Sequence, residues 1–255
     1  MNHVILQAHK ISTGYPKKTV SENLSFQLHS GKLITLIGSN GVGKSTLIRS
    51  ITGIIPVLKG EVLLNNQKIS AYNAARLAQQ ISVVLTDKLP PSNLSVYELV
   101  ALGRQPYTNW LGNLSAADIE KIDWAIASTE IDDLKHKKHY ELSDGQLQKV
   151  LIARALAQDT PLIVLDEPTT HLDLVHKVSV FKLLKKLAHR TQKCILISTH
   201  DMDLSLQMSD EIIVLTKQNI FQGSPQQLIE QEVFEHLFVH ESIFFDKNKA
   251  KFIIK

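Results

Sequence analysis

A glycine-rich run between an apolar segment and a helical one is the feature that most constrains the fold of this chain. Residues 38–46 read Gly-Ser-Asn-Gly-Val-Gly-Lys-Ser-Thr, which fits the pattern G-x-x-x-x-G-K-[ST]. The run follows Leu33–Ile37, typical of a strand buried on both faces, and it opens a predicted helix from Lys44 to about Thr52. Glycines let backbone N–H groups curl around phosphate oxygens, and a helix N-terminus adds positive potential. The arrangement predicts a phosphate-binding loop and disfavours an ordinary glycine turn.

The side chains at the end of this loop indicate what it binds. Lys44 would reach the β- and γ-phosphates of a nucleotide, and the hydroxyl of Ser45 would bind Mg²⁺. The expected nucleotide-binding residues of the loop are Gly38, Ser39, Asn40, Gly41, Val42, Gly43, Lys44, Ser45 and Thr46.

A second apolar strand ends in two carboxylates. Leu162–Leu165 is followed by Asp166, placed as a residue that holds Mg²⁺ through its water shell. Glu167 comes next, beyond the strand end, where it could act as general base on an attacking water. An aspartate at a strand end is common by itself. Together with the phosphate-binding loop, the pair predicts a catalytic site.

The remaining pattern indicates one α/β unit over residues 1–255, without internal repeats. Strands are predicted at His3–Ile11, Leu24–Leu28, Gly60–Leu64, Lys68–Ile69, Ile81–Leu85 and Lys193–Ser198. A helix predicted at Leu174–His189 separates two strands, which implies parallel pairing. Residues 87–158 change to helical periodicity and predict an inserted helical subdomain. Its expected helices are Val96–Gly103, Ser115–Glu130 and Gln146–Gln158, and residues 240–255 predict a C-terminal β-hairpin.

Composition limits the cellular compartments and the classes of partner that fit this chain. The net charge is +3 and the basic residues form no concentrated stripe, so we expect no nucleic-acid partner. The chain has a single cysteine, Cys194, within an apolar run, which fits a buried thiol and a reducing cytosol. No apolar run approaches the roughly 18 residues of a membrane-spanning helix, and the start lacks the pattern of a signal peptide.

A third motif carries a family resemblance. Residues 142–146 read Leu-Ser-Asp-Gly-Gln and lie between the phosphate-binding loop and Asp166. This stretch resembles the LSGGQ signature of ABC ATPases, and its order in the chain matches that family. The resemblance implies a P-loop NTPase core with a parallel sheet, an antiparallel β subdomain and the inserted helical subdomain. It also implies that Ser143, Gly145 and Gln146 bind ATP held, with Mg²⁺, by a second copy of the chain.

Other positions are similar to the same family. Tyr15 looks like the aromatic residue that stacks on adenine, and Asp173 resembles the D-loop residue of the dimer interface. His200 looks like the switch histidine that touches the γ-phosphate, and Pro168 and Thr169 complete the run D-E-P-T. Without the other motifs, a tyrosine near a strand end usually has only a packing role, and a histidine in a loop usually has only a structural role.

Residues 103–107, Gly-Arg-Gln-Pro-Tyr, resemble a motif of ATPases that serve iron–siderophore, haem and cobalamin importers. In that group the segment faces the membrane permease, so Arg104 and Tyr107 are expected there, although a glycine-capped helix end is the simpler alternative. The resemblance implies a homodimer on the inner face of the membrane, bound through permease subunits. An extracytoplasmic substrate-binding protein would act indirectly.

Two positions depart from the family. Thr86-Asp87 stands where a glutamine is usual, and we expect ordered water to bridge Thr86 to Mg²⁺. Asp144 replaces a glycine in the signature and is expected to point away from the nucleotide. We therefore predict hydrolysis with looser coupling to a permease.

Other functions remain open at this point. A non-transport ABC ATPase that acts on nucleic acid or ribosomes would be expected to show a long coiled coil, a second cassette or a basic stripe, none of which the sequence has. A regulatory module with weak turnover is disfavoured by Lys44, Asp166, Glu167 and His200, although Thr86 keeps it open. A GTPase is least favoured, because the guanine motif N-K-x-D is absent.

Overall fold

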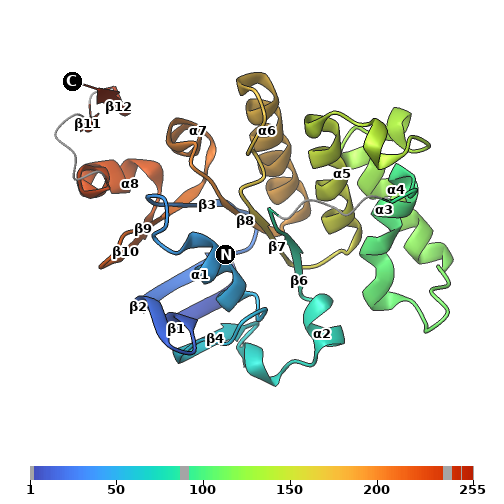
Figure 1. Cartoon of the computed structure of the whole chain (residues 1–255), viewed down its shortest axis with the longest axis horizontal. Coiled ribbons are helices and arrows are strands. Elements are labelled where there is room, and N and C mark those ends of the chain that lie inside the picture. Colours follow the sequence, from blue (N-terminus) through green and yellow to red (C-terminus); the bar gives the residue numbers. More distant parts are fainter. Residues whose placement is uncertain (1–2, 87–91, 238–242, 248, 255) are drawn as a thin grey trace.

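A six-stranded sheet forms the centre of the protein. The computed structural model describes residues 3–86, 92–237, 243–247 and 249–254. The strand order is β10-β9-β3-β8-β7-β6, and all neighbours are parallel except β10 and β9 (Figure 1). This confirms the predicted α/β class. The strands are β3 (Leu33–Ile37), β6 (Ile81–Val84), β7 (Leu162–Asp166), β8 (Cys194–Ser198), β9 (Glu211–Leu215) and β10 (Ile220–Gly223).

The middle of this sheet positions the site. Every residue of β3, β7 and β8 is buried, as expected for parallel strands with both faces covered. Strand β8 lies between the other two, with Ser198 opposite Leu36 on one side and Asp166 on the other. The three strands therefore end at one edge, where ligands bind in open parallel sheets.

A smaller antiparallel sheet covers the first helix. Its order is β2-β1-β4-β5. Helix α1 (Lys44–Ile51) buries Leu47, Ile48 and Ile51 in a cluster that includes residues of both sheets. The strands predicted at the N-terminus are longer in the structure, because they continue through bulges to a tight hairpin at Tyr15 and Lys18. The strands are β1 (Val4–Tyr15), β2 (Lys18–His29), β4 (Lys59–Leu64) and β5 (Gln67–Lys68); η1 (Ile69–Ala71) and α2 (Ala74–Ala78) lead on to β6.

A helical subdomain is inserted between β6 and β7. Its main helices are each preceded by a capping serine, whose side chain accepts a hydrogen bond from the backbone N–H three residues on in a capping box: Ser95, Ser115 and Ser143. The helix predicted at 96–103 ends earlier, because a 3₁₀ turn containing Pro106 follows. The elements are α3 (Val96–Ala101), η2 (Leu102–Tyr107), α4 (Ala116–Ser128), η3 (Asp132–Leu134), η4 (His139–Glu141) and α5 (Asp144–Ala157).

The C-terminal third completes the core and adds a hairpin. Helix α6 (Leu174–Thr191) packs on the sheet and on the helical subdomain. The elements after β8 are α7 (Met202–Met208), α8 (Pro225–Glu230), η5 (Val233–His236), β11 (Ile243–Asp246) and β12 (Lys251–Ile254). Strands β11 and β12 pair antiparallel, while 240–242, 248 and 255 of the predicted hairpin, and 87–91 of the predicted helical subdomain, lie outside the described residues. Among the helices that the structure describes, none has the length and apolarity to cross a bilayer.

Candidate active site

The phosphate-binding loop lies between β3 and α1, against the hairpin that joins β1 to β2. Gly43 has a φ of 111°, a left-handed conformation that favours glycine. A Cβ at this position would lie 2.5 Å from Cγ1 of Val20 in β2. Gly43 also occupies the position before α1, where it has no side chain to cover the first N–H groups of the helix. The loop therefore presents an open helix N-terminus, which suits a phosphate.

Lys44 extends along the inner side of this loop. Only 5% of the residue is exposed, and its ammonium group donates to the carbonyl oxygens of Gly38 (3.0 Å) and Ser39 (3.4 Å). Burial lowers the pKa of Lys44 below its usual value, while the nearby carboxylates of Glu167 and Asp166 oppose that shift. The structure thus brings Lys44 into the electrostatic field of Asp166, the last residue of β7, and of Glu167, which follows it.

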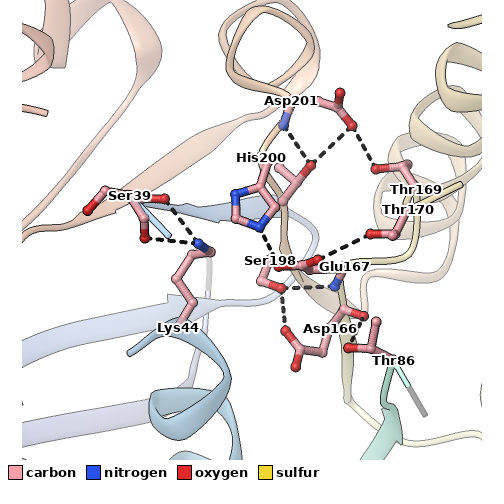
Figure 2. A network of polar contacts seen from close by, with 12 residues as sticks. Ser39, Lys44, Thr86, Asp166, Glu167, Thr169, Thr170, Ser198, His200 and Asp201 are labelled. Atoms are coloured by element: carbon pink, nitrogen blue, oxygen red, sulfur yellow. Dashed lines mark hydrogen bonds and ion pairs between the residues drawn. The ribbon is translucent and has the colours of Figure 1, made fainter. Parts of the chain in front are cut away.

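Asp166 and Glu167 are held by the last residue of the neighbouring strand. The Ser198 hydroxyl donates to Oδ1 of Asp166 at 2.5 Å. The same hydroxyl oxygen accepts the backbone N–H of Glu167 at 2.9 Å. Figure 2 shows these contacts at the carboxyl edge of the sheet, facing Lys44. Asp166 is nearly buried (4% exposed), whereas its neighbour Glu167 reaches towards solvent.

Glu167 and His200 are in direct contact. Nε2 of His200 lies 2.5 Å from Oε1 of Glu167, and the Thr170 hydroxyl donates to Oε2 at 3.2 Å (Figure 2). The backbone of Glu167 is left-handed (φ 52°), a conformation that is strained for a residue with a side chain and is often found at active sites. The loops after β7 and β8 therefore bring the expected general base and the expected switch histidine together.

The oxygen ligands present are of the kind that Mg²⁺ prefers. The Ser45 hydroxyl is exposed at the start of α1, and Asp166 offers a carboxylate beside Lys44. Thr86 follows β6, and its hydroxyl donates to the backbone carbonyl of Asp166 at 3.4 Å. Thr86 thus contacts the backbone of the second metal-binding candidate, and its link to Mg²⁺ through water stays a prediction, whereas Asp87 lies outside the described residues.

Tyr15 lies at the tip of the β1–β2 hairpin. Its side chain is 45% exposed, so its ring is accessible to a ligand. The hairpin approaches the phosphate-binding loop through Val20, which crowds Gly43. Contact of Tyr15 with the base of a bound nucleotide stays a prediction.

Among the residues that the structure describes, no hydrogen bond joins the signature segment to the phosphate-binding loop. Ser143 and Gln146 form the capping box at the start of α5. Gly145 packs against α6, where an added Cβ would lie 2.8 Å from Cδ2 of His176. His176 in turn hydrogen-bonds Asp173 at 2.8 Å, so the signature and the D-loop residue form one surface. Asp144 is exposed at this surface.

Arg104 is buried rather than presented at the surface. It is 7% exposed and pairs with Asp118 at 2.8 Å, and it donates to the carbonyl oxygen of Ala157 at 2.8 Å. Its guanidinium lies 3.9 Å from the ring centroid of Tyr107. The expectation that Arg104 itself faces a partner therefore needs correction, because its charge is used inside the helical subdomain. Tyr107 is 38% exposed and remains accessible.

Two polar residues of the site were missed in the sequence. Ser198 contacts the carboxylate of Asp166 and the backbone N–H of Glu167, and Asp201 links the loop after β8 to neighbouring segments. Asp201 accepts from Thr169 at 2.8 Å and pairs with Lys177 of α6 at 2.7 Å. The available signal was position, because both residues flank the segment 199–200 at the end of a buried strand.

Comparison with known proteins agrees with this geometry. A family model described as ABC transporter matches residues 21–170. The chain is similar to the achromobactin transport ATP-binding protein CbrD of Dickeya dadantii, with 37% identity over 234 residues that cover 91% of this chain and 87% of CbrD. It is also similar to the petrobactin import ATP-binding protein FpuD of Bacillus anthracis, with 34% identity over 234 residues, or 91% and 86% of the two chains.

A solved structure supports the same assignment. A metal-chelate type ABC transporter in an inward-facing conformation aligns with a TM-score of 0.81 and 28% identity, over 92% of this chain and 89% of that one. The family model covers more than half of the sequence, and both relatives exceed 30% identity over most of their lengths. The resemblance drawn from the motifs is thereby confirmed: the chain belongs to the ABC transporter family, as an ATP-binding subunit that hydrolyses ATP.

Proposed function

We propose that the chain powers an importer of iron–siderophore, haem or cobalamin-type substrates. The observation that carries this proposal is the set of relatives at 32–37% identity named for achromobactin, petrobactin and ferric enterobactin transport. The motif at residues 103–107 supports the same group. Direct partners would be permease subunits, which hold the chain at the inner face of the membrane, and a binding protein would deliver substrate from outside.

Uptake measurements test the substrate class. Cells that lack this chain should lose uptake of one ferric siderophore, haem or cobalamin, and expression of the wild-type chain should restore it. Labelled ferric catecholates, hydroxamates and carboxylates, together with haem and cobalamin, make a sufficient panel. Normal uptake of all of them in the deleted strain would contradict the proposal, while ATP hydrolysis by the purified chain would be unaffected by that result.

For hydrolysis, we propose that two copies enclose two ATP molecules. Each ATP would contact the phosphate-binding loop of one copy and Ser143, Gly145 and Gln146 of the other. The exposure of Leu174 (68%) and Val175 (77%), next to Asp173, supports this arrangement, because it gives the D-loop an apolar flank suited to a second copy.

The chemistry proposed for each residue follows from its place. Mg²⁺ bound through Ser45 and Asp166 would neutralise charge on the β- and γ-phosphates. Lys44 would exchange its contacts with loop carbonyls for contacts with phosphate oxygens. Glu167 would accept a proton from the attacking water, and His200, now in contact with Glu167, would orient that water and the γ-phosphate.

A cluster of exposed apolar side chains suits the permease contact. These side chains lie in one short segment of the helical subdomain, residues 102–111, which comprises η2 and the turn after it. The exposed residues are Leu102 (46%), Tyr107 (38%), Trp110 (92%) and Leu111 (61%). Large exposed aromatic residues are typical anchors of protein interfaces. Arg104 supports this segment from inside through its ion pair and its contact with Tyr107.

Replacing Trp110 with alanine should lower substrate uptake about fivefold or more, because an interface anchor is removed. The hydrolysis rate of the purified chain should stay at the wild-type value, since Trp110 is almost fully exposed. Ile54→Ala provides a matched control, because Ile54 is 49% exposed on the catalytic core. Wild-type uptake by Trp110→Ala would place the permease contact elsewhere.

Thr86→Gln should tighten the dependence of hydrolysis on the assembled transporter. A glutamine has the reach to approach the metal and water shell directly, whereas Thr86 is proposed to act through ordered water. Thr86→Ala should lower the hydrolysis rate only about two- to fivefold, as for one lost hydrogen bond. The measurement is hydrolysis in reconstituted membranes with and without loaded binding protein. An identical stimulation ratio for wild type and Thr86→Gln would remove Thr86 as the coupling position.

A further inference from the structure

Ser198 occupies a central position between the two functional loops. It is the last residue of β8, the strand between β3, which leads into the phosphate-binding loop, and β7, which leads into Asp166 and Glu167. No part of Ser198 is exposed. A fully buried hydroxyl beside two carboxylates must find partners inside the protein, and its partners are the two residues of the catalytic pair.

The direction of these hydrogen bonds is fixed. The backbone N–H of Glu167 can only donate, so the Ser198 oxygen accepts it at 2.9 Å. The hydroxyl proton then points to Oδ1 of Asp166 at 2.5 Å. The result is a short chain from Glu167 through Ser198 to Asp166, in which each bond polarises the next (Figure 2).

The same contacts restrain the carboxylate of Asp166 and the backbone of Glu167. With Oδ1 of Asp166 held by Ser198, the orientation of the carboxylate is set and Oδ2 is left for the water shell of a metal. The backbone of Glu167 is left-handed (φ 52°), and its N–H is shared between the hydroxyl of Ser198 and the Ser198 carbonyl oxygen at 3.2 Å. Ser198 therefore supports the turn that directs Glu167 towards His200.

We propose that Ser198 is a positioning residue that sets the geometry of the Mg²⁺-binding carboxylate and of the general base at the same time. The inference rests on the proposed roles of Mg²⁺ and Glu167. It predicts a specific defect: loss of the hydroxyl weakens the use of metal and slows turnover, while metal-free nucleotide binding is preserved. A serine that only filled space in the sheet would affect stability alone.

A second buried serine separates these two roles. Ser82 in β6 is also fully buried, and its hydroxyl bonds the Ala155 carbonyl oxygen (2.9 Å) and the Thr160 hydroxyl (2.7 Å). Ser82 belongs to the same sheet as Ser198, and the substitution Ser82→Ala removes a comparable buried hydrogen bond. That variant controls for the general effect of removing a buried hydroxyl.

The experiment compares Ser198→Ala, Ser198→Thr and Ser198→Val with the wild type and Ser82→Ala. Threonine and valine have the same shape and differ in the hydroxyl. Purified proteins are assayed for the Mg²⁺ concentration that half-saturates hydrolysis, for kcat and KM, and for affinity towards a fluorescent ATP analogue in EDTA. Binding of Mn²⁺ in the presence of ADP is followed by electron paramagnetic resonance, which needs no turnover.

Ser198→Ala and Ser198→Val are expected to raise the half-saturating Mg²⁺ concentration and lower kcat, each by about tenfold, as for the loss of a hydrogen bond to a charged group. Mn²⁺ binding should weaken in parallel, and affinity for the analogue in EDTA should stay within about twofold of wild type. Ser198→Thr should recover most of both properties. Ser82→Ala should lower the melting temperature without changing the Mg²⁺ dependence.

Two results would overturn the inference while the proposed function stands. In the first, the wild type requires Mg²⁺, but Ser198→Ala has the same metal dependence and the same kcat as the wild type. The other is a Ser198→Val protein as active as Ser198→Thr, because the hydroxyl would then be dispensable. A wild type that hydrolyses ATP equally well in EDTA would instead remove the proposed role of Mg²⁺, and this inference with it.

Discussion

Replacing Glu167 with glutamine is expected to lower steady-state ATP hydrolysis on the order of 10²-fold or more, because the attacking water loses its general base. The substitution is nearly isosteric. The amide oxygen can keep one of the contacts that the two carboxylate oxygens make with Thr170 and His200, and the amide NH₂ group takes the place of the other oxygen. ATP affinity should stay close to that of the wild type. Hydrolysis is measured by phosphate release, and affinity by titration with a fluorescent ATP analogue.

The same variant should accumulate an ATP-bound dimer, since closure no longer ends in hydrolysis. Size-exclusion chromatography with light scattering, with and without ATP, would detect the change in mass. Glu61→Gln is a suitable control, because Glu61 is an exposed carboxylate that pairs with Lys68 on the antiparallel sheet. Turnover of Glu167→Gln near the wild-type rate would show that another group accepts the proton.

Much of the catalytic edge could be predicted from the sequence because its motifs are local. The phosphate-binding loop follows a five-residue buried strand whose predicted bounds match β3. The strand before Asp166 is equally apolar and ends at the residue that carries the chemistry. In both cases, a short and mostly apolar run fixes the strand, and the motif residue at its end, a glycine after β3 and a carboxylate in β7, marks where it stops.

What could not be predicted depends on packing between distant segments. The order of strands brings Ser198 beside Asp166, although 31 residues separate them along the chain, and no local pattern reports that neighbour. Arg104 resembles part of a motif, but its burial follows from the position of Asp118 on α4. Strand β9 is a different case, because it was missed although the sequence carries a local signal for it: residues 212–215 are all apolar and would have identified the strand.

Lys44→Ala is expected to weaken ATP binding on the order of 10²-fold, because its buried ammonium group lies along the loop expected to hold the phosphates and charge-assisted bonds are strong. The folded protein without nucleotide should tolerate the change, since the partners of Lys44 are two loop carbonyls and not a buried carboxylate. Lys193→Ala is the matched control, because Lys193 is a largely buried lysine paired with Asp159 away from the site.

The pH dependence gives a second readout for the same residue. Burial lowers the pKa of Lys44 in the nucleotide-free protein. Only the protonated amine attracts phosphate, so wild-type ATP affinity should fall as pH rises through this lowered pKa, earlier than for an ordinary lysine. Lys44→Ala should lack that decline, because the titrating group is gone. Equal affinity of the two proteins at neutral pH, or the same alkaline decline in both, would show that Lys44 does not hold the phosphates.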